Sequence, residues 1–521
     1  MSNQPGSTQA VISVDSAQST KDNNLVNVAK GGGITLIGKV FTNISRFVFV
    51  FLIARLLGAE QYGMYQLSLN TVSLLVGITI LGLDGALVRF IAVYVSRGNK
   101  EKVWGTILIG VGLPLILSSA ISVLLYAVSY QVAESLFHDS RMAPLLQIAS
   151  LIVPASILSD TLVGAVRGFK NMQYPVIAKF VVQPIVRLVL IAAAVFWGLE
   201  VVHAIIIFGI GELLAALMLF YYLNKLFSLN RPASSAQIDF SNIMKFAIPD
   251  WLAGLMDTFR GNIQALLIGS LGSFTGVGIF TVSDQLNTLG HDFYSSINTA
   301  SKPYIAELHD KKERGQLQKI YQTANKWSLL VNIPFFLAMV LFPSQILLIF
   351  GKSFVGGSVA LVVMAWANLV DVGTGMGGAI LNMTGYTKLK LLNNIVSLVV
   401  SLILNVLLIP RFGVLGAAIS ALVVITVLNI LRIIQVHHIL KLTPYNITFL
   451  KPIVATLITG GISYFLSSLY PLDSYLLHLV IHVSVLFIVF ILTILLLGLD
   501  PEDRQMVDRI TARSLKFLKR K

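Results

Sequence analysis

The sequence predicts an all-α integral membrane protein with about 14 transmembrane helices, on the basis of composition, apolar blocks and the placement of charge. Hydrophobic residues make up 55% of the 521 residues and charged residues only 12%. That is roughly half the charged share of a typical soluble domain. The apolar residues come in blocks of roughly 20, the length one helix needs to cross a bilayer. These observations exclude an ordinary soluble enzyme and a fibrous protein.

Each apolar block is expected to form one helix. Lipid offers no hydrogen-bond partners, so the backbone N–H and C=O groups must pair with one another within the helix. A first group is expected before the polar stretch 225–245, at 34–54, 65–85, 105–127, 144–164, 176–197 and 203–224. A second group is expected after it, at 248–270, 277–297, 329–350, 358–383, 391–409, 414–438, 450–469 and 475–498.

The distribution of positive charge predicts that both termini are cytoplasmic. Of the 38 Lys and Arg residues, most fall in the tails and in every second loop when the N-terminus is placed inside. Only four fall in the alternate, outer loops: Arg55, Arg141, Lys352 and Arg411. Cytoplasmic loops carry such an excess of Lys and Arg in membrane proteins. The alternation therefore supports an even number of spans and a plasma (inner) membrane location, expected to be prokaryotic.

Chemical signals other than membrane topology are weak. The chain has no cysteine, which excludes disulfides and cysteine metal sites. Its eight histidines show no HExxH pattern, and there is no P-loop, so we expect no cofactor and no catalytic activity. The net charge of +14 lies in short loops between apolar blocks, so we expect no nucleic-acid partner.

Composition divides the chain into tails, two lobes and an appended helix pair. The start of the chain is polar and has few apolar residues, so we expect a disordered cytoplasmic tail. The polar stretch in the middle of the chain marks the lobe boundary. The expected parts are a tail at 1–30, an N-lobe with helices 1–6 at 31–224, a cytoplasmic linker at 225–245, a C-lobe with helices 7–12 at 246–440, helices 13–14 at 441–499 and a basic tail at 500–521.

Internal repetition predicts that the two lobes are parallel six-helix bundles. The pairs Leu57-Gly58 and Tyr62-Gly63 in the first half are echoed by Leu271-Gly272 and Val277-Gly278 in the second. Parallel repeats indicate two lobes about an axis along the membrane normal, with substrate between them. Because one chain already holds both lobes, we expect a monomer.

Three runs of residues carry a resemblance to a known family. They are Ala54-Arg55-Leu56-Leu57-Gly58-Ala59-Glu60-Gln61-Tyr62-Gly63-Met64-Tyr65, Gly82-Leu83-Asp84-Gly85-Ala86-Leu87-Val88-Arg89-Phe90 and Pro410-Arg411-Phe412-Gly413-Val414-Leu415-Gly416-Ala417-Ala418. Together they resemble the polysaccharide biosynthesis flippases of the multidrug/oligosaccharidyl-lipid/polysaccharide exporter superfamily. The resemblance extends over nearly the whole chain from about residue 30.

The resemblance implies a transporter that carries a polyprenyl-diphosphate-linked oligosaccharide from the cytoplasmic to the outer leaflet by alternating access. Its expected partners are the lipid-linked oligosaccharide, membrane lipids, and the polysaccharide polymerase and export machinery. The seventh helix departs from the family pattern, because Asn262 stands where an acid often precedes the Leu-Gly pair. For that reason no ion site is carried over from the family.

Five polar side chains within spans of the first lobe predict a cationic cavity. Lys39, Asn43 and Arg46 follow one another at spacings of four and three, which places them on one stripe of a helix. Gln183 and Arg187 are also four apart. An ionisable group inside a span is costly and thus needs a reason, and Arg forks match phosphate oxygens bidentately. We predict that this set, with Arg260 of the seventh helix, holds a diphosphate headgroup.

The second lobe is richer in acids and is the predicted place of ion coupling. Asp257, Asp284, His291 and Asp371 all lie within its expected spans. A carboxylate beside amide oxygens suits Na⁺ and a carboxylate beside a histidine suits protons, so Na⁺ and H⁺ both remain open as coupling ions.

Structural explanations compete with these functional ones. Arg187 can pair with Glu212 on the sixth helix, Lys39 can extend to the inner surface, and Asp257 can pair with Arg260 within one helix. Acids near expected helix ends are interpreted as interfacial: Asp84, Asp160, Asp250 and Asp292.

Two other functions are alternatives to the flippase. An ion-coupled multidrug exporter of the same superfamily predicts twelve helices and an acidic cavity in the first lobe. A membrane-embedded polymerase or ligase predicts a large polar outer loop, and the outer loops here are short. Helices 13 and 14 favour the flippase, since they could offer a groove for a lipid tail.

Overall fold

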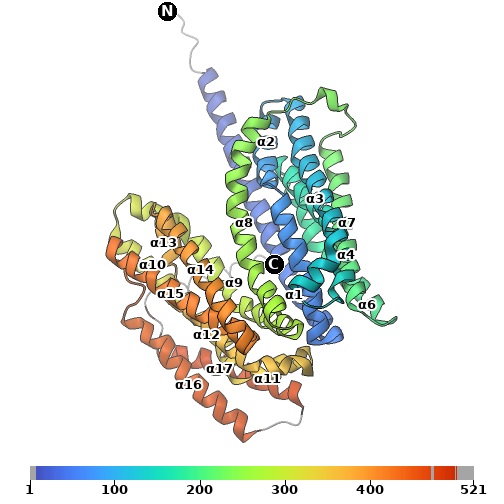
Figure 1. Cartoon of the computed structure of the whole chain (residues 1–521). Coiled ribbons are helices and arrows are strands. Elements are labelled where there is room, and N and C mark those ends of the chain that lie inside the picture. Colours follow the sequence, from blue (N-terminus) through green and yellow to red (C-terminus); the bar gives the residue numbers. More distant parts are fainter. Residues whose placement is uncertain (1–7, 471–473, 499, 501–521) are drawn as a thin grey trace, which may run out of the picture. The chain divides into compact units, whose positions relative to one another are not determined.

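The structure is a computed structural model that describes the backbone of residues 8–470, 474–498 and 500. It describes the side chains of residues 43–470 apart from 257, and of 474–498 and 500. Every regular element in these ranges is a helix (Figure 1). Eleven helices within them are long and apolar enough to cross a membrane, judged by length and composition. The all-α membrane class is confirmed, whereas the count of 14 spans and the side of each terminus stay predictions.

The chain forms two compact units. The first comprises residues up to Leu56 and Leu67–Ile263, and the second comprises Leu57–Gln66 and Gln264 onward. The boundary between the two units near Ile263 lies inside a helix and not in the expected linker. The lobes and linker expected from the sequence therefore stay predictions.

The first unit is built from the helices in the first half of the chain, except residues 57–66 of α1 and the end of α8 after Ile263, which belong to the second unit. They are α1 (Thr8–Thr79), α2 (Leu83–Ser96), α3 (Lys100–Leu136), α4 (Met142–Gly168), α5 (Gln173–Pro175), the π-helical η1 (Val176–Val182), α6 (Gln183–Val195), α7 (Val201–Leu226), the 3-10 turn η2 (Ala233–Ser235) and α8 (Phe240–Leu271).

The second unit is built from the remaining helices. They are α9 (Phe274–Asp310), α10 (Arg314–Leu341), α11 (Pro343–Phe350), the 3-10 helix η3 (Lys352–Gly357), α12 (Ser358–Thr374), α13 (Gly377–Met383), α14 (Thr387–Phe412), α15 (Val414–Leu440), the 3-10 turn η4 (Ile447–Phe449), α16 (Leu450–Leu469) and α17 (Tyr475–Leu496).

The first helix differs from the expectation at both of its ends. It begins at Thr8, so most of the segment 1–30, expected as a disordered tail, is helical in the structure. Extending a helix that already exists needs no new nucleus, and polar residues can therefore continue it. The expected helices 34–54 and 65–85 both lie largely in α1, on either side of Gly58, whose φ of 77° and ψ of 172° interrupt the helix. The second of them stops at Thr79, before Gly82 with φ 67°.

Glycine and proline also divide two helices of the second unit that were expected to be continuous. The expected helix 358–383 is interrupted at Gly375, which has φ 83°, and this left-handed conformation suits glycine above other residues. The expected helix 329–350 is interrupted before Pro343, which starts α11. Proline has no N–H to donate, so it is favoured in the first turn of a new helix.

The core of the first unit holds α2 directly against α4. Leu87 and Ile91 of α2 are fully buried, as are Leu162 and Ala165 of α4. The helices approach so closely that a Cβ at Gly164 would meet the Asp84 carbonyl oxygen. Small residues allow this approach in membrane helices. The contact fixes α2 next to the C-terminal part of α4, where the site described below begins.

A close crossing of two repeated segments lies at the centre of the second unit. Here the segment 57–66 packs against the start of α9. A Cβ on Gly63 would overlap the carbonyl of Phe274, and a Cβ on Gly278 would overlap the carbonyl of Ala59. The interruption at Gly58 releases the Ala59 N–H from the helix, and this N–H donates to Ser353 Oγ at 3.0 Å. The two glycines thus allow the segments to approach closely, and the Ala59 N–H has a hydrogen-bond acceptor.

The helix pair α16–α17 is attached to the second unit through a charged contact. Both helices pack on α10. Asp500, just after α17, accepts from Lys326 Nζ of α10 at 2.7 Å and from Lys451 Nζ of α16 at 2.5 Å. Burial raises the pKa of Asp500, but the two ammonium groups outweigh it and hold that pKa below its ordinary value. The rest of the predicted basic tail, 501–521, lies outside the described residues.

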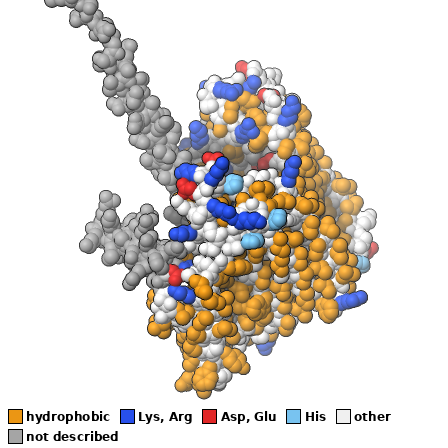
Figure 2. Space-filling view, turned by 90° about the vertical axis from the view of Figure 1, so that its left-hand side faces the viewer, with side chains coloured by type: hydrophobic (Ala, Val, Ile, Leu, Met, Phe, Trp, Pro, Cys, Tyr) orange, Lys and Arg blue, Asp and Glu red, His pale blue; other side chains and the backbone are white. Residues whose placement is uncertain are grey.

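Large apolar side chains are exposed along whole helices, as expected for surfaces that face lipid. On α14 they recur at helical spacing: Leu392, Ile395, Val399, Ile403 and Val406 are all between 43% and 54% exposed. Figure 2 shows a broad hydrophobic face with Lys, Arg and His side chains gathered toward one end of it. An exposed apolar surface of this extent is typical of a membrane-embedded protein.

Substituting a glycine at the crossing should prevent close packing of the second unit. We expect Gly63→Ala and Gly278→Ala each to destabilise the fold by about 1–3 kcal/mol or more, because a helix backbone cannot shift to admit the methyl group. Thermal unfolding of the detergent-purified protein measures this. Gly356→Ala is the control, since its Cβ would meet nothing within 4 Å. Equal melting temperatures for all three variants would contradict the close crossing.

Asp500→Asn should loosen the α16–α17 pair, because it removes the carboxylate that contacts both Lys326, whose side chain is only 4% exposed, and Lys451. We expect the free energy of unfolding to fall by roughly 3 kcal/mol. Glu307→Gln, which removes an exposed pair with Lys311, is the control and should leave the melting temperature almost unchanged.

The stabilisation by Asp500 should depend on pH, and the direction of that dependence follows from its pKa. The folded-state pKa of Asp500 is depressed below 3.8, so the wild-type carboxylate stabilises the fold fully above about pH 4 and less as the pH falls through the folded-state pKa. The difference in melting temperature between wild type and Asp500→Asn should therefore shrink in strong acid. A constant difference down to pH 2 would exclude this role of the carboxylate.

Candidate functional site

Four charged side chains form a continuous chain of ion pairs inside the first unit. Lys179 Nζ lies 3.0 Å from Asp160 Oδ1 and 2.8 Å from Glu212 Oε2. Arg187 Nη2 lies 3.0 Å from the other oxygen of Glu212. The Glu212 side chain is 9% exposed and those of Lys179 and Arg187 are 16% exposed. A charge in such surroundings is tolerated only with a partner, and here each charge has one.

The helix that carries the two cations has an irregular start. Lys179 lies in the π-helical turn Val176–Val182, and α6 begins directly after it with Pro184 near its first position. Proline cannot donate a backbone hydrogen bond, which favours a wider turn before it. The wider turn and the regular helix after it bring Lys179 and Arg187 to the same carboxylate of α7.

Arg187 is therefore paired, as the structural explanation in the sequence analysis proposed. Besides Glu212, its guanidinium lies 3.9 Å from the centre of the Phe208 ring and donates to the Phe208 carbonyl at 3.3 Å. Gln183 is buried beside Glu212. Of the residues predicted to line a cationic cavity, these two are brought together. Lys179 was missed, although a lysine within an expected span is itself a signal.

The other predicted cavity residues lie elsewhere on the first unit. Asn43 and Arg46 are exposed on α1, and Arg260 is exposed on α8. The side chains of Lys39 and Asp257 lie outside the described residues, so the predicted Asp257–Arg260 pair is not tested. Arg46 is expected on the same stripe of α1 as Asn43, and its side chain is exposed, so a ligand can reach it.

Three of the acids interpreted as interfacial line one cavity of the first unit. Asp84 of α2, Asp160 of α4 and Asp250 of α8 border a space of about 530 Å³. Trp251 closes one side and donates from Nε1 to the Gly77 carbonyl at 2.9 Å. Because Asp160 also contacts Lys179, the ion-pair chain borders this acidic cavity. No spacing rule along one helix could have revealed a cluster drawn from three helices.

The second unit joins two of the predicted ion-coupling residues. His291 Nε2 of α9 lies 3.4 Å from Asp371 Oδ2 of α12. Asn429 of α15 donates to the other carboxylate oxygen at 2.8 Å, and Arg432 donates to the Asn429 side chain at 3.2 Å. The cluster offers an imidazole, a carboxylate and an amide at one point, groups that can hold a proton or bind Na⁺. Asn429 and Arg432 were missed by the sequence analysis.

Asp284, a further predicted coupling residue, is exposed on α9, and its charge acts on His291 of the same helix. Among the described residues, no three His, Asp or Glu side chains are arranged to hold a metal ion. The cluster around Asp371 thus combines an acid–base pair with the amide of Asn429.

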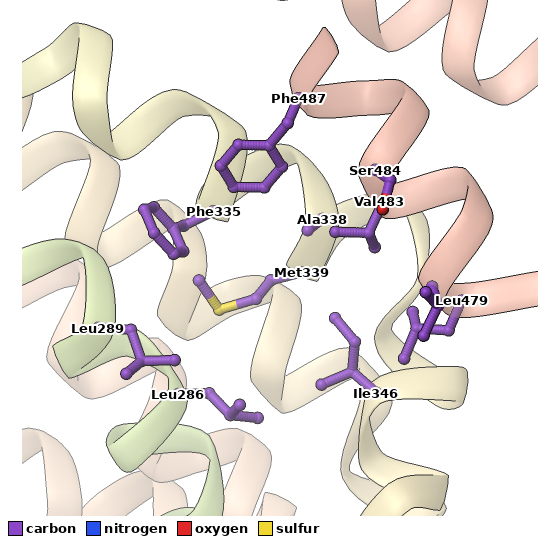
Figure 3. Close-up of a pocket in the computed structure, with 11 residues that line it drawn as sticks. Leu286, Leu289, Phe335, Ala338, Met339, Ile346, Leu479, Val483, Ser484 and Phe487 are labelled. Carbon is purple, nitrogen blue, oxygen red and sulfur yellow. The ribbon is translucent and has the colours of Figure 1, made fainter. Parts of the chain in front are cut away.

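An apolar groove lies between α17 and the helices it packs on. It has a volume of about 390 Å³ and is lined from four helices. Figure 3 shows Phe335 and Met339 of α10 on one side, Leu286 of α9 below them, and Leu479 and Phe487 of α17 opposite. Its lining is almost entirely hydrocarbon, which suits an alkyl or isoprenoid chain and no charged ligand.

Known proteins resemble this chain in sequence and in fold. The model of the family described as Polysaccharide biosynthesis protein matches residues 28–309, and the MatE model matches residues 249–407. Stage V sporulation protein B of Bacillus subtilis (strain 168) is 24% identical over 468 residues, which cover 84% of this chain and 90% of that protein. The probable low-salt glycan biosynthesis flippase Agl15 of Haloferax volcanii is 24% identical over 194 residues, 37% of this chain and 40% of that protein.

The fold likeness is broader than the sequence likeness. The structure of lipid II flippase MurJ in an inward closed conformation has a TM-score of 0.69 and covers 88% of this chain and 97% of its own, at 15% identity. At that identity the likeness establishes the fold only. The resemblance read from the three sequence runs is confirmed by the family match, which spans more than half of the sequence, and the chain belongs to the polysaccharide biosynthesis protein family.

Proposed function

We propose that this protein is a flippase that moves a polyprenyl-diphosphate-linked oligosaccharide from the cytoplasmic to the outer leaflet by alternating access. The observation that carries the proposal is the apolar groove lined by α17. A substrate with a long apolar tail and a polar headgroup needs such a groove, whereas a small soluble substrate does not. The family and the flippase relative Agl15 support the same substrate class.

In this proposal the headgroup and the tail take separate routes. The tail stays in the bilayer or in the groove, so it is not exposed to water, which would be unfavourable for an apolar chain. The diphosphate is neutralised by an exposed cation of the first unit, the Arg46 guanidinium on α1. Arg260 of α8 is also exposed and stays a candidate from the sequence. Arg187 is not assigned to the headgroup, because Glu212 already neutralises it. Lys39 and Asn43 remain candidates through their place on the same stripe as Arg46.

Multidrug export is the second candidate function, and one observation favours it. The cavity bordered by Asp84, Asp160 and Asp250 is acidic, and an acidic first-lobe cavity suits a cationic drug. The MatE match over residues 249–407 points the same way. The two functions differ in the charge of the cargo, which makes a direct comparison decisive.

Transport by reconstituted vesicles tests the two functions side by side. We expect wild type to move a fluorescent polyprenyl-diphosphate sugar and not a cationic dye. Arg46→Ala should slow headgroup transfer by about tenfold or more, the loss of one charge-assisted contact of about 1.5–3 kcal/mol. Arg411→Ala, which removes an exposed arginine far along the sequence from the predicted cavity, should transport normally.

The opposite result is equally informative. Expulsion of the dye with no movement of the lipid-linked sugar, and loss of that expulsion in Asp250→Asn, would replace the flippase by the exporter.

We further propose that the His291–Asp371 pair couples transport to protons. An imidazole beside a carboxylate can take up and release a proton during a cycle, and the other carboxylate oxygen is already engaged by Asn429. Asp371→Asn should abolish the acceleration of transport by an imposed pH gradient, and Asp310→Asn, an exposed acid at the end of α9, should not. Acceleration of the wild type by a Na⁺ gradient and not by a pH gradient would assign the site to Na⁺ instead.

A further inference from the structure

A second cavity of the first unit is surrounded by positive charge. It has a volume of about 520 Å³ and lies where α2 ends, α3 begins and α8 begins. Four cations border it: Arg89, Arg97, Lys102 and Lys245. The segments that carry them lie on the side that the distribution of Lys and Arg predicts to be cytoplasmic. Asp239 is the single acid in its lining.

Two of the four cations lie over aromatic rings. The Arg89 guanidinium lies 4.5 Å from the centre of the Phe246 ring, and Lys102 Nζ lies 5.4 Å from that of Tyr94. No ion pair joins any of the four cations to an acid within the part of the chain that the structure describes. A cation–π contact holds a cation in place and leaves its net charge intact, so the positive charge remains available to a ligand.

The one acid of the cavity has another task. Asp239 Oδ2 accepts from the Tyr94 hydroxyl at 3.1 Å and from Asn242 Nδ2 at 3.0 Å. The hydrogen bond from Asn242, together with that from Tyr94, lowers the pKa of Asp239 below its ordinary value. The carboxylate thus fixes the start of α8 against α2 and gives the cavity a defined shape, while the cations outnumber it.

From this arrangement we infer that the cavity is a binding site for a phosphate-bearing anion. Two guanidinium groups and two ammonium groups around one space match a group with several charged oxygens better than a single carboxylate. The ligand is the headgroup of an anionic lipid or a free phosphate compound, which share this chemistry. Ile238 and Phe240, on both sides of Asp239, are about half exposed, at 51% and 50%, and offer apolar contact next to the cavity.

A simpler explanation is that these cations only orient the protein in the membrane. Topological lysines and arginines act through their number on one side and need no cavity, no ring support and no defined neighbours. That explanation predicts that removing any two cytoplasmic cations changes anion binding equally. The inference predicts instead that only cations at this cavity matter, and it holds whatever the protein transports.

The experiment measures anion binding to the full-length protein purified in an uncharged detergent. Two probes are titrated by calorimetry: inorganic pyrophosphate and short-chain phosphatidic acid, with short-chain phosphatidylcholine as the uncharged lipid reference. Wild type is compared with Arg97→Gln/Lys245→Gln, which removes two exposed cations of the cavity. The matched control is Lys319→Gln/Lys388→Gln, two exposed lysines of the second unit with the same change in net charge. Melting temperatures verify that each variant is folded.

We expect the dissociation constant of the bound probe to rise about tenfold in the cavity variant and to change less than about twofold in the control. Binding of both probes identifies a general phosphate site. Binding of phosphatidic acid alone assigns the site to a lipid headgroup, and binding of pyrophosphate alone assigns it to a free phosphate compound. Equal weakening in both double variants, or no binding of either probe to wild type, would overturn the inference.

Discussion

The cost of an unpaired charge in apolar surroundings is the constraint on which most of this structure depends. That cost is several kcal/mol for each ion, and the protein meets it by joining helices through buried pairs. Glu212 of α7 contacts both Lys179 and Arg187, and Asp160 of α4 supplies the second negative charge. Asp371 of α12 contacts His291 of α9, and Asp500 joins α10 to α16. Each pair therefore both satisfies a charge and fixes two helices relative to one another, so any motion that separates those helices must offer the charges new partners.

The helices were predictable from the sequence, whereas the contacts between them were largely not. Apolar blocks identify helices because lipid imposes the same rule on every span, and the expected segments appear with shifted ends. The exceptions are local: Gly58 and Gly375 interrupt helices through their backbone angles. Spacing along one helix shows which residues share a face, so it could place Gln183 beside Arg187. It could not choose between a ligand and Glu212 as the partner of Arg187, nor bring Asp84, Asp160 and Asp250 from three helices to one cavity.

The repeated sequence pattern gains a physical meaning in the second unit. Gly63 and Gly278 stand at equivalent places in the two halves of the sequence, and each is pressed against the backbone of the other half's segment. A duplicated element that meets its own copy must carry a small residue at the same place in both copies, because the approach is mutual. The sequence showed the echo of Tyr62-Gly63 in Val277-Gly278, but only the folded chain shows that the two copies touch.

Attachment of α16 and α17 through Asp500 has a consequence for biosynthesis. Both helices enter the membrane before the ribosome has delivered the residue that secures them, since Asp500 follows α17 in the chain. Lys326, nearly buried in the folded protein, is therefore synthesised long before Asp500, the carboxylate that it contacts at 2.7 Å. Completion of the apolar groove, one wall of which is α17, is thereby tied to the synthesis of the residue that follows that helix.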